Sequence, residues 1–262
     1  ALGIIVTGLS YSVRGELRQV SVSREMVQSK AQAEAAIALV LQQMSASAQR
    51  PNRLMLVNLL YEGQAIDVQV MPLNGLIDIN SAPAPLLARL FEGAGGMATQ
   101  AAEELAKSVV DARMRPDKQG QAIRFDAIQD LLRIPGIGYE LYARLSPLIT
   151  TEAGGSGKVN PLAAPAAVLQ VIAGGGNAAA VAGFIARRET EATGADATMF
   201  DGSFVDTAAT QRFQLQARVP LLSGSSSLLT CSVDLSEGAR EGMPWRIFFC
   251  GHQFQTNLGN GL

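Results

Sequence analysis

The chain has 262 residues, of which 17% are charged and 48% hydrophobic, and its formal net charge is −2. This hydrophobic content can form a packed core and excludes a wholly disordered chain, while the slightly acidic balance argues against nucleic acid as the main partner. One histidine and two cysteines exclude a His-rich metal site, a Cys-rich zinc module and most histidine-based catalysis. The sequence shows no evident partner for His252 and no phosphate-binding loop motif, so we do not expect an enzyme.

The first segment is predicted to be one long helix that ends near Ser47. Residues 1–13 carry no charge, and neither proline nor glycine occurs between Gly15 and Pro51. We expect this helix to bury an apolar stripe with steps of four or seven residues: Val20, Val27, Ala31, Ala35 and Leu39. Its first turns belong either to an ordinary core helix or to the outer half of a membrane anchor, since a bilayer span needs about 20 apolar residues. The sequence has no initiator methionine, so we expect a trimmed chain.

Strand patterns lie on both sides of a helical block. Alternating apolar residues and turn signals predict strands at residues 54–63, 65–73, 212–221, 227–235 and 244–252. The order of long helix, strands, helical block and strands favours an α+β fold with a helical domain inserted into its sheet. We expect three segments: a first part at 1–75, the inserted all-α domain at 76–200, and a second part at 201–262.

The two cysteines are predicted to form a disulfide. Cys231 and Cys250 lie at equal distances from the centre of the predicted C-terminal hairpin, one in each strand. That symmetry places them opposite each other across the ladder, and a disulfide there indicates an oxidising compartment. Two buried thiols that never meet are the alternative.

The helical block contains an internal repeat. The openings of the two copies, Ile79–Leu90 and Val159–Ile172, each have a hydrophobic residue, an asparagine, an Ala/Pro turn and an apolar helix. Each is followed by a glycine-rich turn and a second helix that ends in arginine, at Arg113 and Arg188, and then by a Phe-Asp pair at the same spacing. The same features in the same order in both copies indicate a repeated structural unit.

Residues 131–149 have a helix–hairpin–helix pattern around a Pro-Gly-Ile-Gly turn. Gly136 and Gly138 permit the tight turn, and Ile137 is expected to fill the gap between the helices. In DNA-binding versions the turn amides hold a phosphate at a helix N-terminus. Here Glu140 follows the turn, and its carboxylate repels phosphate, so we expect a packing module without a ligand.

Three stretches resemble a known family, that of the minor pseudopilin K of bacterial type II secretion systems. They are Asn74–Pro83, Leu131–Thr151 and Lys158–Pro165, which follow a hydrophobic start and an amphipathic stem. The resemblance covers essentially the whole chain. It implies a pilin-like long N-terminal helix packed on an antiparallel sheet, with a large inserted domain of helix–hairpin–helix (SAM-like) repeats. The family's prepilin-peptidase site is missing from this sequence, and the second copy has Pro161-Leu162 in its turn.

The resemblance also implies a function. Such a protein caps the tip of the periplasmic pseudopilus with two smaller minor pseudopilins, of the I and J types, and supports protein export across the outer membrane. In the full-length protein the N-terminal helix lies in the bacterial inner membrane, and the globular part lies in the periplasm. The competing interpretation is a helix–hairpin–helix DNA-binding protein of the competence type. Residues 78–200 argue against it, because they contain eleven cations and thirteen anions.

Two sets of candidate site residues follow from this resemblance. Calcium is implied for some family members, and its oxygen ligands are expected from three evenly spaced aspartates: Asp196, Asp201 and Asp206. Their spacing is not that of an EF-hand, and solvated turn carboxylates are the alternative. Partner helices are expected to contact small exposed residues of the first helix: Ala33, Ala36 and Ala46.

Overall fold

The structure is a computed structural model that describes residues 2–47, 49–116, 122–176, 178–190, 195–221, 224–236 and 242–255. The chain forms two compact units. The helix–sheet unit contains Ala1–Ala48, Leu56–Val70 and Gln214–Leu262, and the helical unit contains Gln49–Met55 and Met71–Phe213. Compared with the insertion expected at 76–200, the helical unit starts earlier, ends later and includes a short segment that follows the first helix.

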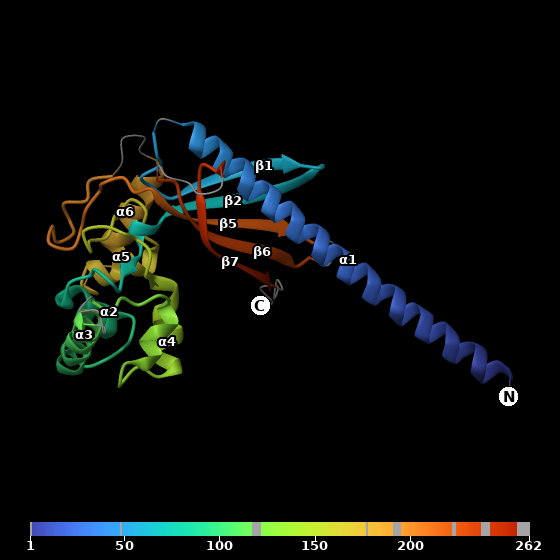
Figure 1. The fold of residues 1–262 in the computed structure, drawn as a ribbon, viewed down its shortest axis with the longest axis horizontal. Coiled ribbons are helices and arrows are strands. Elements are labelled where there is room, and N and C mark those ends of the chain that lie inside the picture. Colours follow the sequence, from blue (N-terminus) through green and yellow to red (C-terminus); the bar gives the residue numbers. More distant parts are fainter. Residues whose placement is uncertain are drawn as a thin grey trace. The chain divides into compact units, whose positions relative to one another are not determined.

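The helix–sheet unit consists of a long helix and a five-stranded sheet (Figure 1). Helix α1 spans Leu2–Ala46 and packs against β6. The strands are β1 (Met55–Tyr61), β2 (Gln64–Pro72), β5 (Arg212–Pro220), β6 (Ser226–Asp234) and β7 (Arg246–Gln255). They lie in the order β1-β2-β5-β6-β7, so the helical unit enters the chain between two strands that are neighbours in the sheet. Within the described residues, none of the helices combines enough length with enough apolar sequence to span a bilayer.

Alternating side chains give this sheet one buried face. In β2 the side chains of Ile66 and Val68 are buried, whereas Asp67 between them is exposed, and β5 shows the same alternation. The turn between β1 and β2 is Glu62-Gly63, with φ angles of 50° and 76°. These positive angles match the twist of a two-residue hairpin, and glycine adopts them without strain.

The helical unit contains five α-helices among its described residues: α2 (Ala84–Gly93), α3 (Thr99–Met114), α4 (Tyr139–Leu145), α5 (Ala166–Ile172) and α6 (Ala178–Thr190). Three 3₁₀ helices, η1 (Leu73–Gly75), η2 (Ile128–Arg133) and η3 (Ser146–Leu148), and two short strands, β3 (Ile77–Asp78) and β4 (Ile149–Thr150), complete it. One continuous hydrophobic core joins these elements. Its aromatic residues include Phe184 and Phe200, whose rings pack edge to face with their centroids 5.0 Å apart.

The repeat predicted from the sequence corresponds to two similar successions of elements. In the first copy, β3 leads to α2, a glycine turn and α3, and the chain returns to pair β3 with β4 in parallel. In the second copy, Val159 leads to α5, a glycine turn and α6, and the chain returns to pair Val159 with Val205 in parallel. Among the residues that the structure describes, only the first copy has η2, α4 and η3 before its return strand. The segment with the Pro-Gly-Ile-Gly turn is therefore an addition to one copy of a common plan.

Candidate functional sites

Helix α1 buries a different face from the one that the sequence predicted. Val27 is 71% exposed and Leu39 is 44% exposed, Ala31 is exposed and Ala35 is half-buried, and the side chain of Val20 lies outside the described part. The buried residues are Ser29, Gln32, Ala33, Ala36, Ile37, Val40, Leu41 and Met44. The prediction of the buried stripe was wrong because this second face, with its large apolar residues in the last turns of the helix, buries more apolar area against the sheet.

Two of the three alanines expected to contact partner helices are not accessible. Ala33 and Ala36 have no exposed surface because they lie on the buried face of α1, so that prediction was wrong for both. Ala46, at the end of the helix, is exposed. Among the described side chains of α1, Met26 is also exposed, and four further exposed apolar residues form a set that we call the α1 stripe: Val27, Ala31, Ala38 and Leu39.

A disulfide joins Cys231 on β6 to Cys250 on β7. The strands are antiparallel, and the two cysteines lie directly opposite each other in the register, in the arrangement that the sequence symmetry predicted. Their Cα atoms are 4.2 Å apart. The bond ties the terminal strand of the sheet to its neighbour, and it is compatible with an oxidising compartment.

The single histidine has a partner that the sequence analysis missed. Nε2 of His252 on β7 lies 2.7 Å from Oγ of Ser227 on β6. A hydroxyl and an imidazole at this distance can form an activated nucleophile, but Ser227 is completely buried, so no substrate reaches it. Burial, and to a smaller extent the charge of Lys30, lower the pKa of His252, while Glu34 opposes this shift. The hairpin register could have revealed the pair, since residue 229 lies opposite His252 and Ser227 is its diagonal neighbour.

The three aspartates considered as calcium ligands each bond to their own turn. Each accepts a hydrogen bond from the backbone N–H two residues later, which is an Asx-turn. Hydrogen bonds from Thr198 and Ser203 lower the pKa of Asp196 and Asp201 respectively, and Asp206 accepts a further bond from Ser156. In the described ranges no three His, Cys, Asp or Glu side chains are grouped so that they could hold a metal ion. The carboxylates as placed do not fit a calcium site, and calcium binding stays a prediction.

The Pro-Gly-Ile-Gly turn lies between η2 and α4. Gly136 has a φ of 95°, which favours glycine, and Ile137 is buried beneath the turn. The first element is a short 3₁₀ helix rather than the α-helix of the predicted pattern. The cation on α4 is engaged within the chain, because Arg144 lies 3.0 Å from Glu140 and donates to the carbonyl oxygen of Gly95. The structure therefore shows a closed, well-packed turn.

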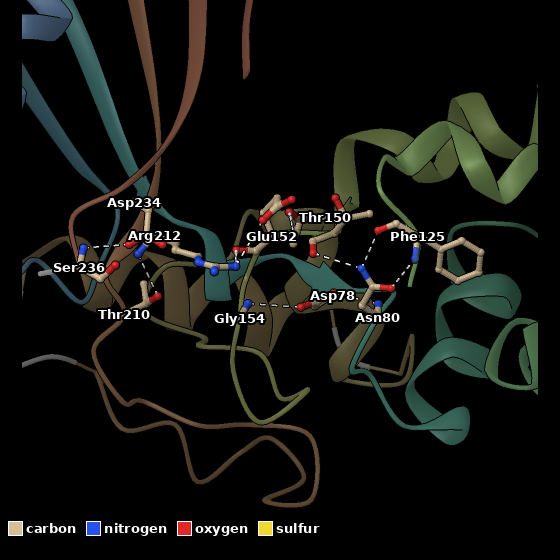
Figure 2. A network of polar contacts seen from close by, with 11 residues as sticks. Asp78, Asn80, Phe125, Thr150, Glu152, Gly154, Thr210, Arg212, Asp234 and Ser236 are labelled. Atoms are coloured by element: carbon tan, nitrogen blue, oxygen red, sulfur yellow. Dashed lines mark hydrogen bonds and ion pairs between the residues drawn. The ribbon is translucent and has the colours of Figure 1, made fainter. Parts of the chain in front are cut away.

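A polar network connects the start of the first copy with its end (Figure 2). The side chain of Asn80 donates to the carbonyl oxygens of Phe125 and Thr151, at 2.9 and 3.2 Å, and accepts from the N–H of Phe125 at 2.8 Å. The carboxylate of Asp78, which is 3% exposed, accepts from the N–H groups of Asn80 and Gly154. Because only an amide side chain both donates and accepts in this way, the asparagine of the repeat opening is a structural requirement.

The opening of the second copy has an equivalent asparagine. Asn160 is completely buried. Its side chain donates to the carbonyl oxygen of Asn52 at 2.6 Å and accepts from the N–H of Leu162 at 3.0 Å. Both copies thus use an asparagine amide, half-buried at Asn80 and completely buried at Asn160, to hold together chain segments that are distant in sequence.

The arginines in the last turns of α3 and α6, Arg113 and Arg188, also have equivalent positions. Arg113 donates to the carbonyl oxygen of Ile79 at 2.8 Å, and Arg188 donates to those of Pro161 and Ala164 at 3.0 and 2.6 Å. Each therefore reaches from the end of its second helix to the opening of its own copy. Burial lowers the pKa of both side chains, but a guanidinium remains charged in a protein, and a cation at a helix C-terminus also favours the helix dipole.

These features define a fold class: a long helix on a sheet, with a helical insertion between neighbouring strands. The structure is similar to a chain in the crystal structure of the GspK-GspI-GspJ complex from the enterotoxigenic Escherichia coli type 2 secretion system. The TM-score is 0.54 at 13% sequence identity, and the match covers 92% of this chain and 99% of the other. At this identity the likeness concerns the fold. No protein-family model and no curated protein matches the sequence.

Proposed function

We propose that this chain is a minor pseudopilin of a bacterial type II secretion system. In this role it caps the tip of the pseudopilus together with two smaller minor pseudopilins and supports protein export across the outer membrane. The observation that carries the proposal is the long helix α1, which packs one face against its own sheet and leaves the α1 stripe exposed. The likeness in fold to a chain of the GspK-GspI-GspJ complex supports it, and the role is structural rather than enzymatic.

The α1 stripe has the chemistry of a helix–helix interface. Ala31 and Ala38 are small, so a second helix can approach closely between the larger Val27 and Leu39. Burying one large aliphatic side chain stabilises an interface by about 1.5–3 kcal/mol. Beside the stripe, Lys30 and Glu34 form an exposed ion pair at 3.8 Å. The pair contributes little to stability by itself, but the two opposite charges balance each other next to the apolar residues.

The proposed location is the bacterial inner membrane and the periplasm. The N-terminal helix would hold the full-length protein in the membrane, and the globular part would lie in the periplasm. The disulfide between Cys231 and Cys250 supports this location because disulfides persist in the oxidising periplasm.

Co-expression with the I- and J-type minor pseudopilins of the same genome tests the proposal. We expect a complex with one copy of each protein, measured by size-exclusion chromatography with light scattering. Ala31→Glu or Ala38→Glu should weaken it at least tenfold, because the substitution places a charge in an apolar interface. The matched control is Ala101→Glu, on an exposed position of α3, which should leave the affinity unchanged. Failure of the wild-type proteins to associate would contradict the proposed function.

A further inference from the structure

Strand β7 is an edge strand of the sheet in the described part of the chain. It pairs with β6 on one side and, among the described residues, with no strand on the other. Natural sheets protect such edges with charges, prolines or short strands. β7 has 10 residues and contains neither charged residues nor proline between Ile247 and Gln255. Ile247, Phe249 and Phe254 are exposed on it, so the edge has the features of a docking strand rather than of a protected one.

The register shows which backbone groups of β7 face the open side. In an antiparallel pair, opposite residues that do not exchange hydrogen bonds have Cα atoms about 4.5 Å apart, against about 5.5 Å for those that do. Cys231 and Cys250 are opposite each other at 4.2 Å, so they are a pair without mutual hydrogen bonds. The N–H and C=O groups of Cys250 therefore point away from β6. Those of His252 and Phe254 follow at period two and point the same way.

Two contacts hold this edge in an extended form. The disulfide fixes the middle of β7 to β6. The ring of Phe249 covers Gly251 so closely that a Cβ at this position would lie 3.0 Å from two ring atoms. The ring thus shields the one glycine of the strand, at which a sheet is otherwise weakest.

The open edge lies near the part of α1 that carries the stripe. His252 lies close enough to Lys30 and Glu34 of α1 for their charges to influence its pKa. Glu34 is three residues after Ala31 and four before Ala38, so all three lie on one side of the helix. The other edge strand, β1, is separated from β7 by three strands, which is about 19 Å at the usual strand spacing. A partner on the α1 stripe therefore has β7 within reach before β1.

We propose that β7 binds an extended strand from the globular part of one of the smaller pseudopilins, whose helix packs on the α1 stripe. The partner strand extends the sheet through the outward N–H and C=O groups of Cys250, His252 and Phe254. Because the edge carries no formal charge from Ile247 to Gln255, the strand it accepts there is uncharged and apolar at alternate positions. This inference rests on the proposed function, since it identifies how the same partner is held at a second point.

A proline at position 254 tests the backbone contact. Phe254→Pro removes the outward N–H and the ring, whereas the matched variant Phe254→Ala removes only the ring. Both should have the same melting temperature, because the ladder with β6 does not use this N–H. We expect Phe254→Pro to bind the co-purified smaller pseudopilins at least tenfold more weakly than Phe254→Ala does, measured by biolayer interferometry. Equal affinities, or a lower melting temperature for Phe254→Pro, would overturn the inference.

A second pair of variants addresses the side chains at the edge. Phe249→Lys places a charge on β7, and Leu60→Lys places one at a position of β1 that is also largely exposed. Only Phe249→Lys should weaken the complex. No complex with the wild-type chain overturns both this inference and the proposed function. A complex that is sensitive to Ala31→Glu but insensitive to Phe254→Pro and Phe249→Lys overturns the inference alone. A dimer of this chain by itself that Phe254→Pro abolishes would assign the edge to a second copy instead.

Discussion

Replacing the buried Arg188 should destabilise the helical unit more than the same replacement of an exposed arginine. Its side chain is 6% exposed and satisfies two carbonyl oxygens, those of Pro161 and Ala164, at 3.0 and 2.6 Å. Arg188→Met keeps most of the volume but leaves both buried acceptors without a donor. Each unsatisfied acceptor costs about 1–3 kcal/mol, so with two acceptors we expect the free energy of unfolding to fall by about 2–6 kcal/mol.

Urea denaturation followed by circular dichroism at 222 nm measures this loss, because the signal comes mainly from the helices. The neighbouring Arg187 provides the control, since it is exposed on the same turn of α6 and Arg187→Met should change stability by less than about 0.5 kcal/mol. Arg188→Lys should fall between the two, because it keeps the charge but loses the planar fork that reaches two carbonyls. Equal losses for Arg188→Met and Arg187→Met would refute the reasoning.

Four further predictions concern the rest of the chain. Because the pKa of His252 is lowered in the folded state, the unfolded chain binds this proton more readily. The contribution of His252 to the free energy of unfolding is therefore fully present above about pH 6.5 and is lost as the pH falls below that value. His252→Gln should remove this loss, which a comparison of urea midpoints at pH 7.5 and 5.0 measures. If the aspartates bind calcium, millimolar calcium should raise the melting temperature and Asp201→Asn should abolish the rise, whereas an unchanged melting temperature would contradict the calcium prediction. Fluorescence anisotropy should detect no sub-micromolar binding of duplex DNA near 150 mM salt, since the helical unit has no basic excess. The double variant Cys231→Ser/Cys250→Ser should lose about 3 kcal/mol of stability in chemical denaturation.

The order of the elements could be predicted from the sequence because it depends on local signals. The two hairpins follow from period-two alternation and from turn residues such as Glu62-Gly63, whose positive φ angles the structure confirms. The symmetry of Cys231 and Cys250 gave the register of β6 and β7. Such features depend on neighbours in the chain or directly across one ladder, so a single sequence contains the information.

The contacts of the helical unit could not be predicted in the same way. The repeat pattern singled out the asparagines and the terminal arginines, but nothing in the pattern shows that Asn80 bonds to Phe125 or that Asn160 bonds to Asn52. These partners are distant in sequence and are set by how the copies close on themselves. The evenly spaced aspartates show a different problem. Their regular spacing suggested one shared site, but in the structure each carboxylate accepts a hydrogen bond within its own turn.

The wrong choice of face on α1 bears directly on the proposed function. The helix has two apolar faces, and the sheet can cover only one of them. The sheet covers the face with Ile37, Val40 and Leu41, which leaves the α1 stripe in solvent. Single exposed apolar residues are ordinary on protein surfaces, but a row of them at helical spacing along one helix is the pattern of an interface. A second helix that covers this row removes its apolar surface from water, which is the driving force that an assembly of several such chains requires.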